Sequence, residues 1–465
     1  MIFQNKVFKD IRFWIVFFFI MRLYGITNPP LEIAHNWRQT TVTMVARNFY
    51  DGDANVFYPC VDMAGEKSGI TGMEFPFFNY LIYLVSLVFG YQHWYGRLIN
   101  LIVSSFGIWY FFKLVNKYFS PGIAFNAAFI LIVSLWFAYS RKIMPDTFSM
   151  SILFAGMFYG SNYLDRENKN IDLALYFSLC LIALLSKISS AYILVTFIPL
   201  FINHKIKLKP KIFFIFSALT YVSIVAWWYF WWVPFLVKEF EYWHFFMGKN
   251  FVEGAKDIMN NFNQALLRFY DTSLKFTGFA TFMAGLFFIF KNKEKNLQYI
   301  FLLSFFSFLV FVFKEGYNFI HHTYYVIPFV PVMALVAGYA ISIIPVRRMA
   351  SFVLIVIAVE GILNEQHDFR IKDSEKYKLS LEKIADGISN RDDRIVINGG
   401  GNPQQLYFTH HKGWTVESEK LNDAGFLNEI KNKGCKFIFV NKNDFKNKLN
   451  YPSVFENDFF RVYKF

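Results

Sequence analysis

Charged residues are scarce in this chain of 465 residues. Asp, Glu, Lys and Arg together make up 17% of it, whereas ordinary soluble proteins contain about 25%. Hydrophobic residues make up 55%, aromatic residues 21%, and the mean hydropathy is +0.31. This shortage of charge excludes an ordinary soluble globular protein and indicates a polytopic α-helical membrane protein.

Cysteine is also scarce. The three cysteines, Cys60, Cys180 and Cys435, have neither the number nor the spacing of a disulfide framework or a cysteine metal site. A disulfide between Cys60 and Cys435 is the one pairing left open. No small-residue cleavage site follows the basic N-terminal segment with Lys9 and Arg12. We therefore expect the first apolar run to be a retained membrane span rather than a signal peptide.

Long apolar runs predict the membrane spans. A further run, Pro76–Gly90, is short for a span and fits a helix that lies in the membrane interface. The other runs number eleven, and their predicted bounds are Ile11–Ile26, Leu98–Phe119, Ile123–Tyr139, Thr147–Leu164, Leu173–Ser186, Ala191–Ile202, Ile212–Val233, Phe276–Phe290, Leu297–Phe313, Tyr324–Ile344 and Met349–Leu363.

The net charge of +13 supports this topology. In a soluble protein such an excess would favour a nucleic-acid partner. Here much of it lies in alternate short connections, for example at Lys113 and Lys117 or at Arg347 and Arg348. With eleven spans these connections share the side of the N-terminus, as the positive-inside rule requires. We therefore expect no nucleic-acid partner, and we place the loop at 29–96 and the C-terminus outside.

Two domains are expected. Residues 1–363 form a transmembrane catalytic domain that includes the outer loop 29–96. From residue 364 the apolar runs shorten and charge returns, which predicts a soluble α/β domain over 364–465. Its expected elements are an amphipathic helix at Ser374–Ser389, strands at Arg394–Asn398 and Lys436–Asn441, and a helix at Leu421–Lys433. The sequence leaves open whether this domain docks the acceptor or supports the loop.

The outer loop carries the first candidate chemistry. Connections in compact folds usually have about 4–6 residues, so a polar loop of this length indicates function. Asp62 and Glu74 lie on glycine-rich irregular chain, where a partly desolvated carboxylate can serve as a general base. The alternative is that these two carboxylates pair with Arg38 and Arg47 and hold the loop together. His35 and Arg38 are expected at the start of a helix that rests on the membrane face and whose apolar positions are Val42, Val45, Ala46 and Phe49.

Cations at the outer ends of later spans form the second group of candidates. They run against the positive-inside trend, and ionisable groups at such positions favour function. Clamping a phosphate needs their charge and their directed donors. Snorkelling to lipid headgroups is the alternative for Arg141 and Lys142. The residues concerned are Arg141, Lys142 and Asp146 in RKIMPD, Lys187 in LLSKISSAY, and His321, His322, Tyr324 and Tyr325 in HHTYY.

Three further patterns carry less information. His321 and His322 make a weak metal pair, because adjacent residues rarely share one ligand geometry and no third ligand is evident nearby. The aromatic run Trp227–Trp232 is typical of an interfacial belt, although a sugar-stacking platform is an alternative. The GGGN turn at Gly399–Asn402 lacks the context of a nucleotide-binding loop, so a tight turn is expected.

Several of these motifs together resemble the GT-C superfamily of membrane glycosyltransferases. HNWRQTTVTMVARNFY, FYPCVD and GMEFP resemble bacterial family 39 glycosyltransferases with a WRQ motif, which are related to protein O-mannosyltransferases and to the lipid A aminoarabinose transferase. RKIMPD, the lysine in LLSKISS and the span with Tyr325, Pro328 and Pro331 add to this similarity. The similarity covers about residues 10–345 and is sharpest over 35–97.

The resemblance implies an inverting transfer of a sugar from a polyprenyl-phosphate donor to a glycan, lipid or protein acceptor. It places the enzyme in the bacterial inner membrane among membrane lipids, with its active site on the periplasmic face. The relatives carry an acidic base early in the first loop, where this chain has His35 or Asn36. Glu74 and Asp62 match carboxylates that relatives carry, and Lys187 matches a lysine near the donor phosphate.

The expected site therefore has three parts. Its catalytic residues are Glu74, Asp62 and His35; its donor-phosphate ligands are Arg38, Lys187, Arg141, Tyr324 and His322; and Arg47, Arg97 and Asp146 serve the acceptor or the structure. No cofactor is required if the cations neutralise the leaving phosphate, and no metal ligand set is indicated. A transporter or flippase of lipid-linked sugars is the rival, although the sequence shows neither the inverted repeats nor the interrupted helices that are typical of transporters. A non-catalytic export scaffold is a third alternative.

Overall fold

The computed structural model describes residues 7–165, 169–242 and 248–465. The chain divides into two compact units. The first, called the helical unit here, contains residues 1–26, 97–230 and 246–367. The second, called the loop–sheet unit, contains residues 27–96, 231–245 and 368–465.

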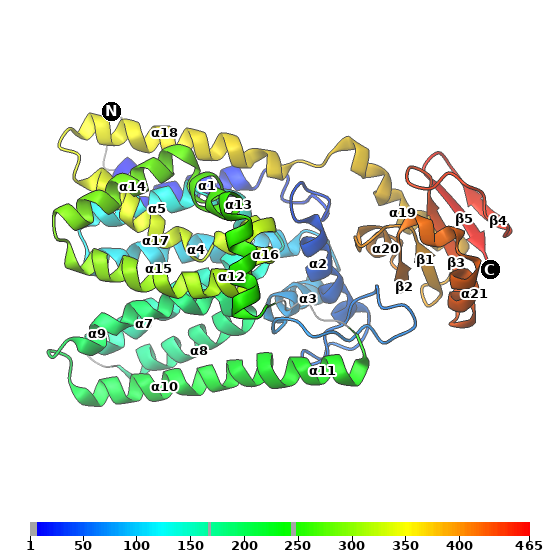
Figure 1. Ribbon diagram of the computed structural model, residues 1–465, viewed down its shortest axis with the longest axis horizontal. Coiled ribbons are helices and arrows are strands. Elements are labelled where there is room, and N and C mark those ends of the chain that lie inside the picture. Colours follow the sequence, from blue (N-terminus) through cyan, green and yellow to red (C-terminus); the bar gives the residue numbers. More distant parts are fainter. Residues whose placement is uncertain (1–6, 166–168, 243–247) are drawn as a thin grey trace. The chain divides into compact units, whose positions relative to one another are not determined.

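The helical unit is built from apolar helices that follow one another with short connections (Figure 1). Most residues of α5 and nearly every residue of α17 are buried, which is typical of helices with neighbours on several sides. The helices are α1 (Ile11–Arg22), α4 (Tyr95–Tyr118), α5 (Pro121–Val133), α6 (Trp136–Tyr139), α7 (Pro145–Asp165), α8 (Asn170–Ser186), η3 (Ile188–Phe197), α9 (Ile198–Ile202), α10 (Leu208–Trp227), η4 (Trp228–Trp232), α12 (Phe251–Asn260), α13 (Phe262–Leu267), η5 (Arg268–Ser273), α14 (Lys275–Lys291), α15 (Lys295–Glu315), α16 (Tyr317–His321), η6 (Thr323–Val326), α17 (Val330–Ser342) and α18 (Arg347–Glu365).

Small residues allow α5 and α17 to pack closely. A Cβ atom on Gly338 of α17 would lie 2.6 Å from the backbone nitrogen of Ala127 in α5. Such close approach is how apolar helices associate where burial from water gives no driving force between them. The two helices pack along their length, and α14 packs on α17 as well. This core positions the ends of the helices that carry the candidate cations.

Within the described residues, four helices are long and apolar enough to cross a membrane by themselves. They are Tyr95–Tyr118, Leu208–Phe240, Lys295–Glu315 and Arg347–Phe369, and the pair Phe262–Ser273 and Lys275–Lys291, bent by 98°, is a fifth candidate. Shorter apolar helices supply the other runs, among them α5, α8 and α17. The chain is thus a mostly helical membrane protein, while the count of eleven spans stays a prediction.

Three predicted spans are interrupted. Ile123–Tyr139 divides at Ser134 into α5 and α6. The hydroxyl of Ser134 donates a hydrogen bond to the backbone oxygen of Leu131, near the end of α5. Ala191–Ile202 divides into η3 and α9, with Pro199 in the first turn of α9. Tyr324–Ile344 divides into η6 and α17, with Pro331 near the start of α17. Proline lacks the backbone donor that a continuous helix needs, so it favours the breaks at Pro199 and Pro331. The expectation from the sequence that the helices are uninterrupted is therefore wrong.

The loop–sheet unit combines the outer loop with the C-terminal segment. It contains a five-stranded sheet in the order β2-β1-β3-β5-β4 (Figure 1). Strands β2, β1 and β3 are parallel to one another, and β5 is antiparallel to both of its neighbours, β3 and β4. Its elements are α2 (Asn36–Asp51), α3 (Phe77–Phe89), α11 (Val233–Phe240), η7 (Gln366–Phe369), η8 (Asp373–Ser380), α19 (Leu381–Ile388), β1 (Arg394–Ile397), α20 (Gln404–Thr409), β2 (Gly413–Thr415), η9 (Ser418–Asn422), α21 (Ala424–Asn432), β3 (Cys435–Asn441), β4 (Ser453–Glu456) and β5 (Phe460–Lys464).

The predicted elements of the C-terminal segment are present with shifted ends. The two predicted strands are β1 and β3, and the helix predicted at Leu421–Lys433 begins later, as α21. The helix predicted at Ser374–Ser389 is a tight 3₁₀ segment, η8, followed by the shorter α19. All three cysteines are free, so the Cys60–Cys435 disulfide is not formed.

One hydrophobic core joins the outer loop to the sheet. Met44, Val45 and Phe49 of α2 lie in the same buried cluster as Ile395 of β1 and Phe439 of β3. In its contacts the loop therefore belongs with the C-terminal segment rather than with the helices beside it in sequence. The sequence left two roles open for the C-terminal segment, docking of the acceptor and support of the loop. The shared core is evidence for support of the loop.

Candidate functional site

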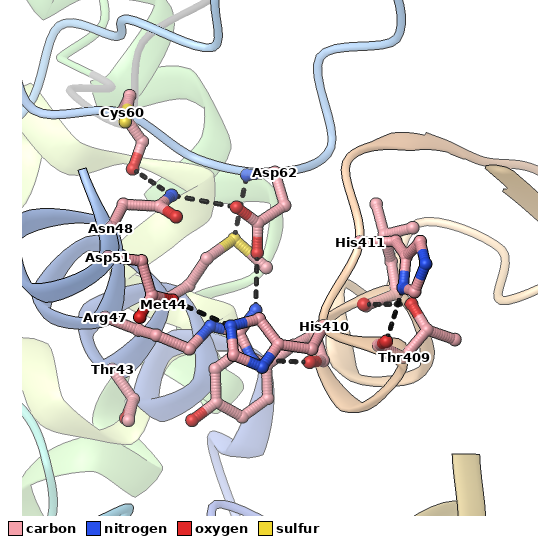
Figure 2. Close-up of polar contacts among 12 residues, drawn as sticks. Thr43, Met44, Arg47, Asn48, Asp51, Cys60, Asp62, Thr409, His410 and His411 are labelled. Carbon is pink, nitrogen blue, oxygen red and sulfur yellow. Dashed lines mark hydrogen bonds and ion pairs between the residues drawn. The ribbon is translucent and has the colours of Figure 1, made fainter. Parts of the chain in front are cut away.

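Asp62 lies in a buried polar cluster on α2. Its Oδ2 accepts a hydrogen bond from Nη2 of Arg47 at 2.7 Å, and its Oδ1 accepts one from Nδ2 of Asn48 at 2.8 Å. Figure 2 shows the carboxylate of Asp62 held between these two side chains, which are neighbours on α2. Asp62 and Arg47 are each 3% exposed. Both oxygens of the carboxylate are therefore engaged by donors of the loop itself.

Arg47 also ties the loop to the C-terminal segment. Its Nη1 donates to the backbone oxygen of Tyr407 at 2.8 Å, and its guanidinium lies 4.1 Å from the centre of the Tyr407 ring. Burial lowers the pKa of Arg47, but the neighbouring Asp62, Tyr407 and Tyr91 together outweigh burial and hold that pKa above its usual value. These contacts suit a structural role of Arg47, and its role toward an acceptor stays a prediction.

Glu74 pairs with Arg38. Nη2 of Arg38 donates to Oε1 of Glu74, and both side chains are about nine-tenths buried. The sequence alternative, in which Asp62 and Glu74 pair with Arg47 and Arg38, is thus the observed arrangement. A role of either carboxylate as general base stays a prediction.

His35 immediately precedes α2. The helix begins at Asn36, so His35 and Arg38 lie at its start, as the sequence predicted. The backbone of His35 has a φ of 54°, in the left-handed region that residues other than glycine seldom adopt. Such strained positions are common at functional sites, and this observation keeps His35 among the candidates.

In the helical unit, four of the predicted residues lie together. Lys187 follows the last residue of α8, and its Nζ lies 3.8 Å from Oδ1 of Asp146 in the first turn of α7. The same Nζ lies 5.8 Å from the centre of the Tyr324 ring and 5.9 Å from that of Tyr325. His322 stacks on Tyr324, with 5.4 Å between ring centres. We call Lys187, Asp146, Tyr324, Tyr325 and His322 the lysine cluster.

Arg141 is held by backbone carbonyls at the end of α1. Its two terminal nitrogens donate to the oxygens of Tyr24 and Gly25, the latter at 2.8 Å. Arg141 is 0% exposed and Lys142 is 1% exposed, so snorkelling to headgroups, which the sequence left open for both, is wrong. Both residues lie in the connection between α6 and α7.

Sequence reasoning missed two buried residues that position this segment. Arg22, at the end of α1, donates from Nη1 to the hydroxyl of Ser140. Arg141, the next residue after Ser140, donates to the backbone oxygen of Gly25, shortly after Arg22, so the two arginines link the same two segments. Asn100 of α4 donates from Nδ2 to the backbone oxygens of Tyr139 and Lys142 at 3.0 and 2.8 Å. A buried polar residue within an apolar run was the available signal for each.

The remaining candidates are Arg97, the GGGN segment and His321, and each is described by its burial or its contacts. Arg97 is 0% exposed within α4. The GGGN segment is a turn, as predicted, in which Gly400 has a φ of 61° and Gly401 accepts a hydrogen bond from the Trp37 indole. The ring of His321 contacts that of Tyr317, whereas the ring of His322 contacts that of Tyr324. In the described ranges, no group of three His, Cys, Asp or Glu side chains is placed to hold a metal ion.

The aromatic run Trp227–Trp232 contains a π-helical segment, η4, inside one long helix. Trp227, Phe230 and Trp231 are exposed, whereas Trp228 and Tyr229 are buried. The exposed rings stand on an apolar helix, which is the arrangement of an interfacial belt.

Comparison with known proteins identifies the fold. Residues 74–231 match a family described as dolichyl-phosphate-mannose-protein mannosyltransferase. Apo ArnT from Cupriavidus metallidurans has a similar crystal structure, with a TM-score of 0.59, 10% sequence identity and 97% of each chain covered. Its complex with undecaprenyl phosphate matches at a TM-score of 0.56 and 8% identity, over 97% of this chain and 98% of that one. The chain therefore has the GT-C fold that these structures share.

A second protein of similar fold was solved with other ligands. The archaeal oligosaccharyltransferase AglB from Archaeoglobus fulgidus, in complex with an inhibitory peptide and a dolichol-phosphate, has a TM-score of 0.55 and 12% identity, over 92% of this chain and 69% of that one. No curated protein sequence matches the chain. These structural similarities, all at 12% sequence identity or less, show a shared fold.

Proposed function

We propose that this protein is an inverting glycosyltransferase of the bacterial inner membrane. It moves a sugar from a polyprenyl-phosphate donor to an acceptor on the periplasmic side, which is a glycan, a lipid or a protein. The lysine cluster on the GT-C fold carries this proposal, because it places a cation among tyrosine rings at the junction of α8 with η3.

In the proposed reaction the acceptor hydroxyl loses its proton and its oxygen attacks the anomeric carbon of the donor. The bond from that carbon to the phosphate oxygen breaks, and the polyprenyl phosphate leaves. Lys187 neutralises the charge that develops on the leaving phosphate, and such electrostatic stabilisation is usually the largest single contribution. Arg38, Arg141, Tyr324 and His322 are further proposed phosphate ligands.

We favour Glu74 over Asp62 as the base that takes the acceptor proton. Both oxygens of Asp62 already accept hydrogen bonds from Arg47 and Asn48, so an acceptor hydroxyl would have to share an oxygen with one of these donors. Glu74 lies directly before Pro76 and the apolar helix α3, which suits a partly desolvated carboxylate. His35 is the third candidate, and it fits the position where relatives carry their acidic residue.

Release of polyprenyl phosphate from purified protein tests the proposal without knowledge of the acceptor. The protein in nanodiscs is incubated with polyprenyl-phosphate donors that carry different labelled sugars, together with envelope extract as acceptor. We expect release with at least one sugar and a loss of 100-fold or more in rate for Lys187→Gln. Lys209→Gln, at the exposed start of α10, is the matched control with unchanged rate.

Two outcomes would overturn the proposal. No release with any donor, from protein that unfolds cooperatively on heating, contradicts glycosyl transfer. Movement of labelled lipid across the bilayer without transfer identifies a transporter of lipid-linked sugars instead.

A further inference from the structure

An apolar cavity of about 300 Å³ lies inside the helical unit. Side chains of five helical segments line it: α4, α7, the η3–α9 segment, α15 and α17. Its apolar lining includes Phe111, Phe154, Met157, Ile193 and Leu335. This volume reaches the lower end of the range for small-ligand pockets, roughly 300–1,000 Å³. The lining favours a hydrocarbon chain over a polar ligand, because none of these five side chains offers a hydrogen-bonding group to one.

One end of the cavity is polar. Four lining residues there carry hydroxyl or amide groups: Tyr118, Ser161, Asn203 and Asn296. Tyr118 ends α4, Asn203 follows α9 and Asn296 begins α15, so all three lie where helices meet a connection. Nζ of Lys117 donates to Ser161 at 3.0 Å and pairs with Asp165 at 2.5 Å, which joins the ends of α4 and α7.

Two lysine segments adjoin this polar end. Lys205, Lys207, Lys209 and Lys211 follow Asn203, and Lys291, Lys293 and Lys295 precede Asn296. Lys211 donates to the backbone oxygens of Phe201 and Asn203, at 2.5 and 2.9 Å, and so stays at the end of α9. Glu294 is the acidic residue within these segments, so their charge is strongly positive. The positive-inside rule assigns this side to the cytoplasm.

We propose that the cavity binds one acyl chain of an anionic phospholipid from the leaflet on the lysine side. The apolar lining takes the chain, and the lysines attract the phosphate of the headgroup. Basic segments next to a membrane recognise anionic lipids in this way, and each lysine near the surface raises the affinity about fivefold. This site is separate from the lysine cluster and does not depend on the proposed transferase activity.

Native mass spectrometry of protein released from nanodiscs tests the cavity. With equal amounts of phosphatidylglycerol and phosphatidylcholine, we expect one phosphatidylglycerol to stay bound. Leu335→Trp, which fills the cavity, abolishes this binding. Leu219→Trp, on the exposed face of α10, is the matched control and retains it. Retention of the lipid by a folded Leu335→Trp protein would overturn the cavity as the site.

A second pair of variants tests the headgroup and avoids any change in the interior. Lys293→Gln with Lys295→Gln lowers phosphatidylglycerol binding about 25-fold, whereas arginine at both positions preserves it. Both lysines are exposed, so these variants keep the fold even if Leu335→Trp does not. Equal retention of phosphatidylcholine, or a bound polyprenyl phosphate in its place, would contradict the proposed ligand.

Discussion

At the residue scale, the Arg47–Asp62 pair decides the stability of the outer loop. Removing one partner leaves an uncompensated buried charge, which costs about 3–5 kcal/mol. We therefore expect Arg47→Met and Asp62→Asn each to lower the free energy of unfolding of the loop–sheet unit, measured by denaturant titration of the whole protein. Arg391→Met is the control, because the Arg391 side chain is 42% exposed, and its ion pairs contribute at most about 1 kcal/mol.

The double variant Arg47→Met with Asp62→Leu separates the two possible roles of Asp62. If the pair is purely structural, apolar replacement of both partners restores most of the lost stability, and activity returns with it. Restored stability without activity would show that Asp62 takes part in the reaction.

His410 predicts a pH dependence of stability. Its Nε2 lies 2.7 Å from Asp51 of α2 and its Nδ1 lies 2.9 Å from Glu382 of α19. Burial lowers the pKa of His410, but the bonds to the two carboxylates outweigh it and hold that pKa above 6.5. Arg47 and Arg391, the nearby cations, act in the lowering direction. The stabilisation is therefore complete below pH 6.5 and is lost as the pH rises through the raised folded-state pKa.

Thermal unfolding over a pH series measures this contribution. The melting temperature of the wild type should exceed that of His410→Gln at pH 6, and the difference should disappear as the pH rises to 9. His411 is a contrasting control, because burial lowers its pKa below 6.5, so its contribution is lost as the pH falls. A difference between wild type and His410→Gln that stays constant over this range would contradict the assignment.

At the element scale, glycine sets the distance between α18 and α5. A Cβ atom on Gly361 of α18 would lie 1.9 Å from the backbone oxygen of Val133, the last residue of α5. Gly361→Ala should therefore push the helices apart and cost about 1–3 kcal/mol. The melting temperature in detergent measures this loss.

Gly387 provides the opposite case. It lies within α19, and a Cβ atom there would meet no atom within 4 Å. Gly387→Ala should raise stability by about 0.4–1 kcal/mol, because alanine restricts the unfolded chain. Equal effects at the two glycines would show that helix contact does not govern the loss at Gly361.

At the scale of the whole molecule, the sequence places the lysine segments and the C-terminal segment on opposite sides of the membrane. Single cysteines at Lys209 and Glu419, in a variant without Cys60, should react with an impermeant maleimide from opposite sides of sealed vesicles. The other two native cysteines are buried and stay unlabelled. Labelling of both positions from one side would exclude an odd number of spans between them.

The sequence predicted the fold class correctly because membrane helices are encoded locally. Each apolar run must bury its own backbone groups, so hydropathy shows where helices form. It also placed β1, β3 and α21. The broken spans were missed because the interruptions depend on how Ser134, Pro199 and Pro331 pack, which hydropathy does not report.

Of the candidate site, the sequence identified the residue types and the structure decided their partners. It offered two roles for Asp62 and Glu74, and only the folded chain shows them paired with Arg47 and Arg38. It placed Lys187, Asp146 and Tyr324 at helix ends, and packing brought them together. Arg22 was passed over because a charge within an apolar run looks the same whether it faces lipid or a neighbouring helix.

Composition alone determined that this protein lies in a membrane, because charge and hydropathy are properties of each residue and add up without knowledge of contacts. Tertiary structure alone decided that the outer loop and the C-terminal sheet share one core. Arg47 and Tyr407 are separated by 360 positions in the chain, and no local pattern reports a contact at such a distance. That contact depends on shape and burial, which exist only once the chain has folded.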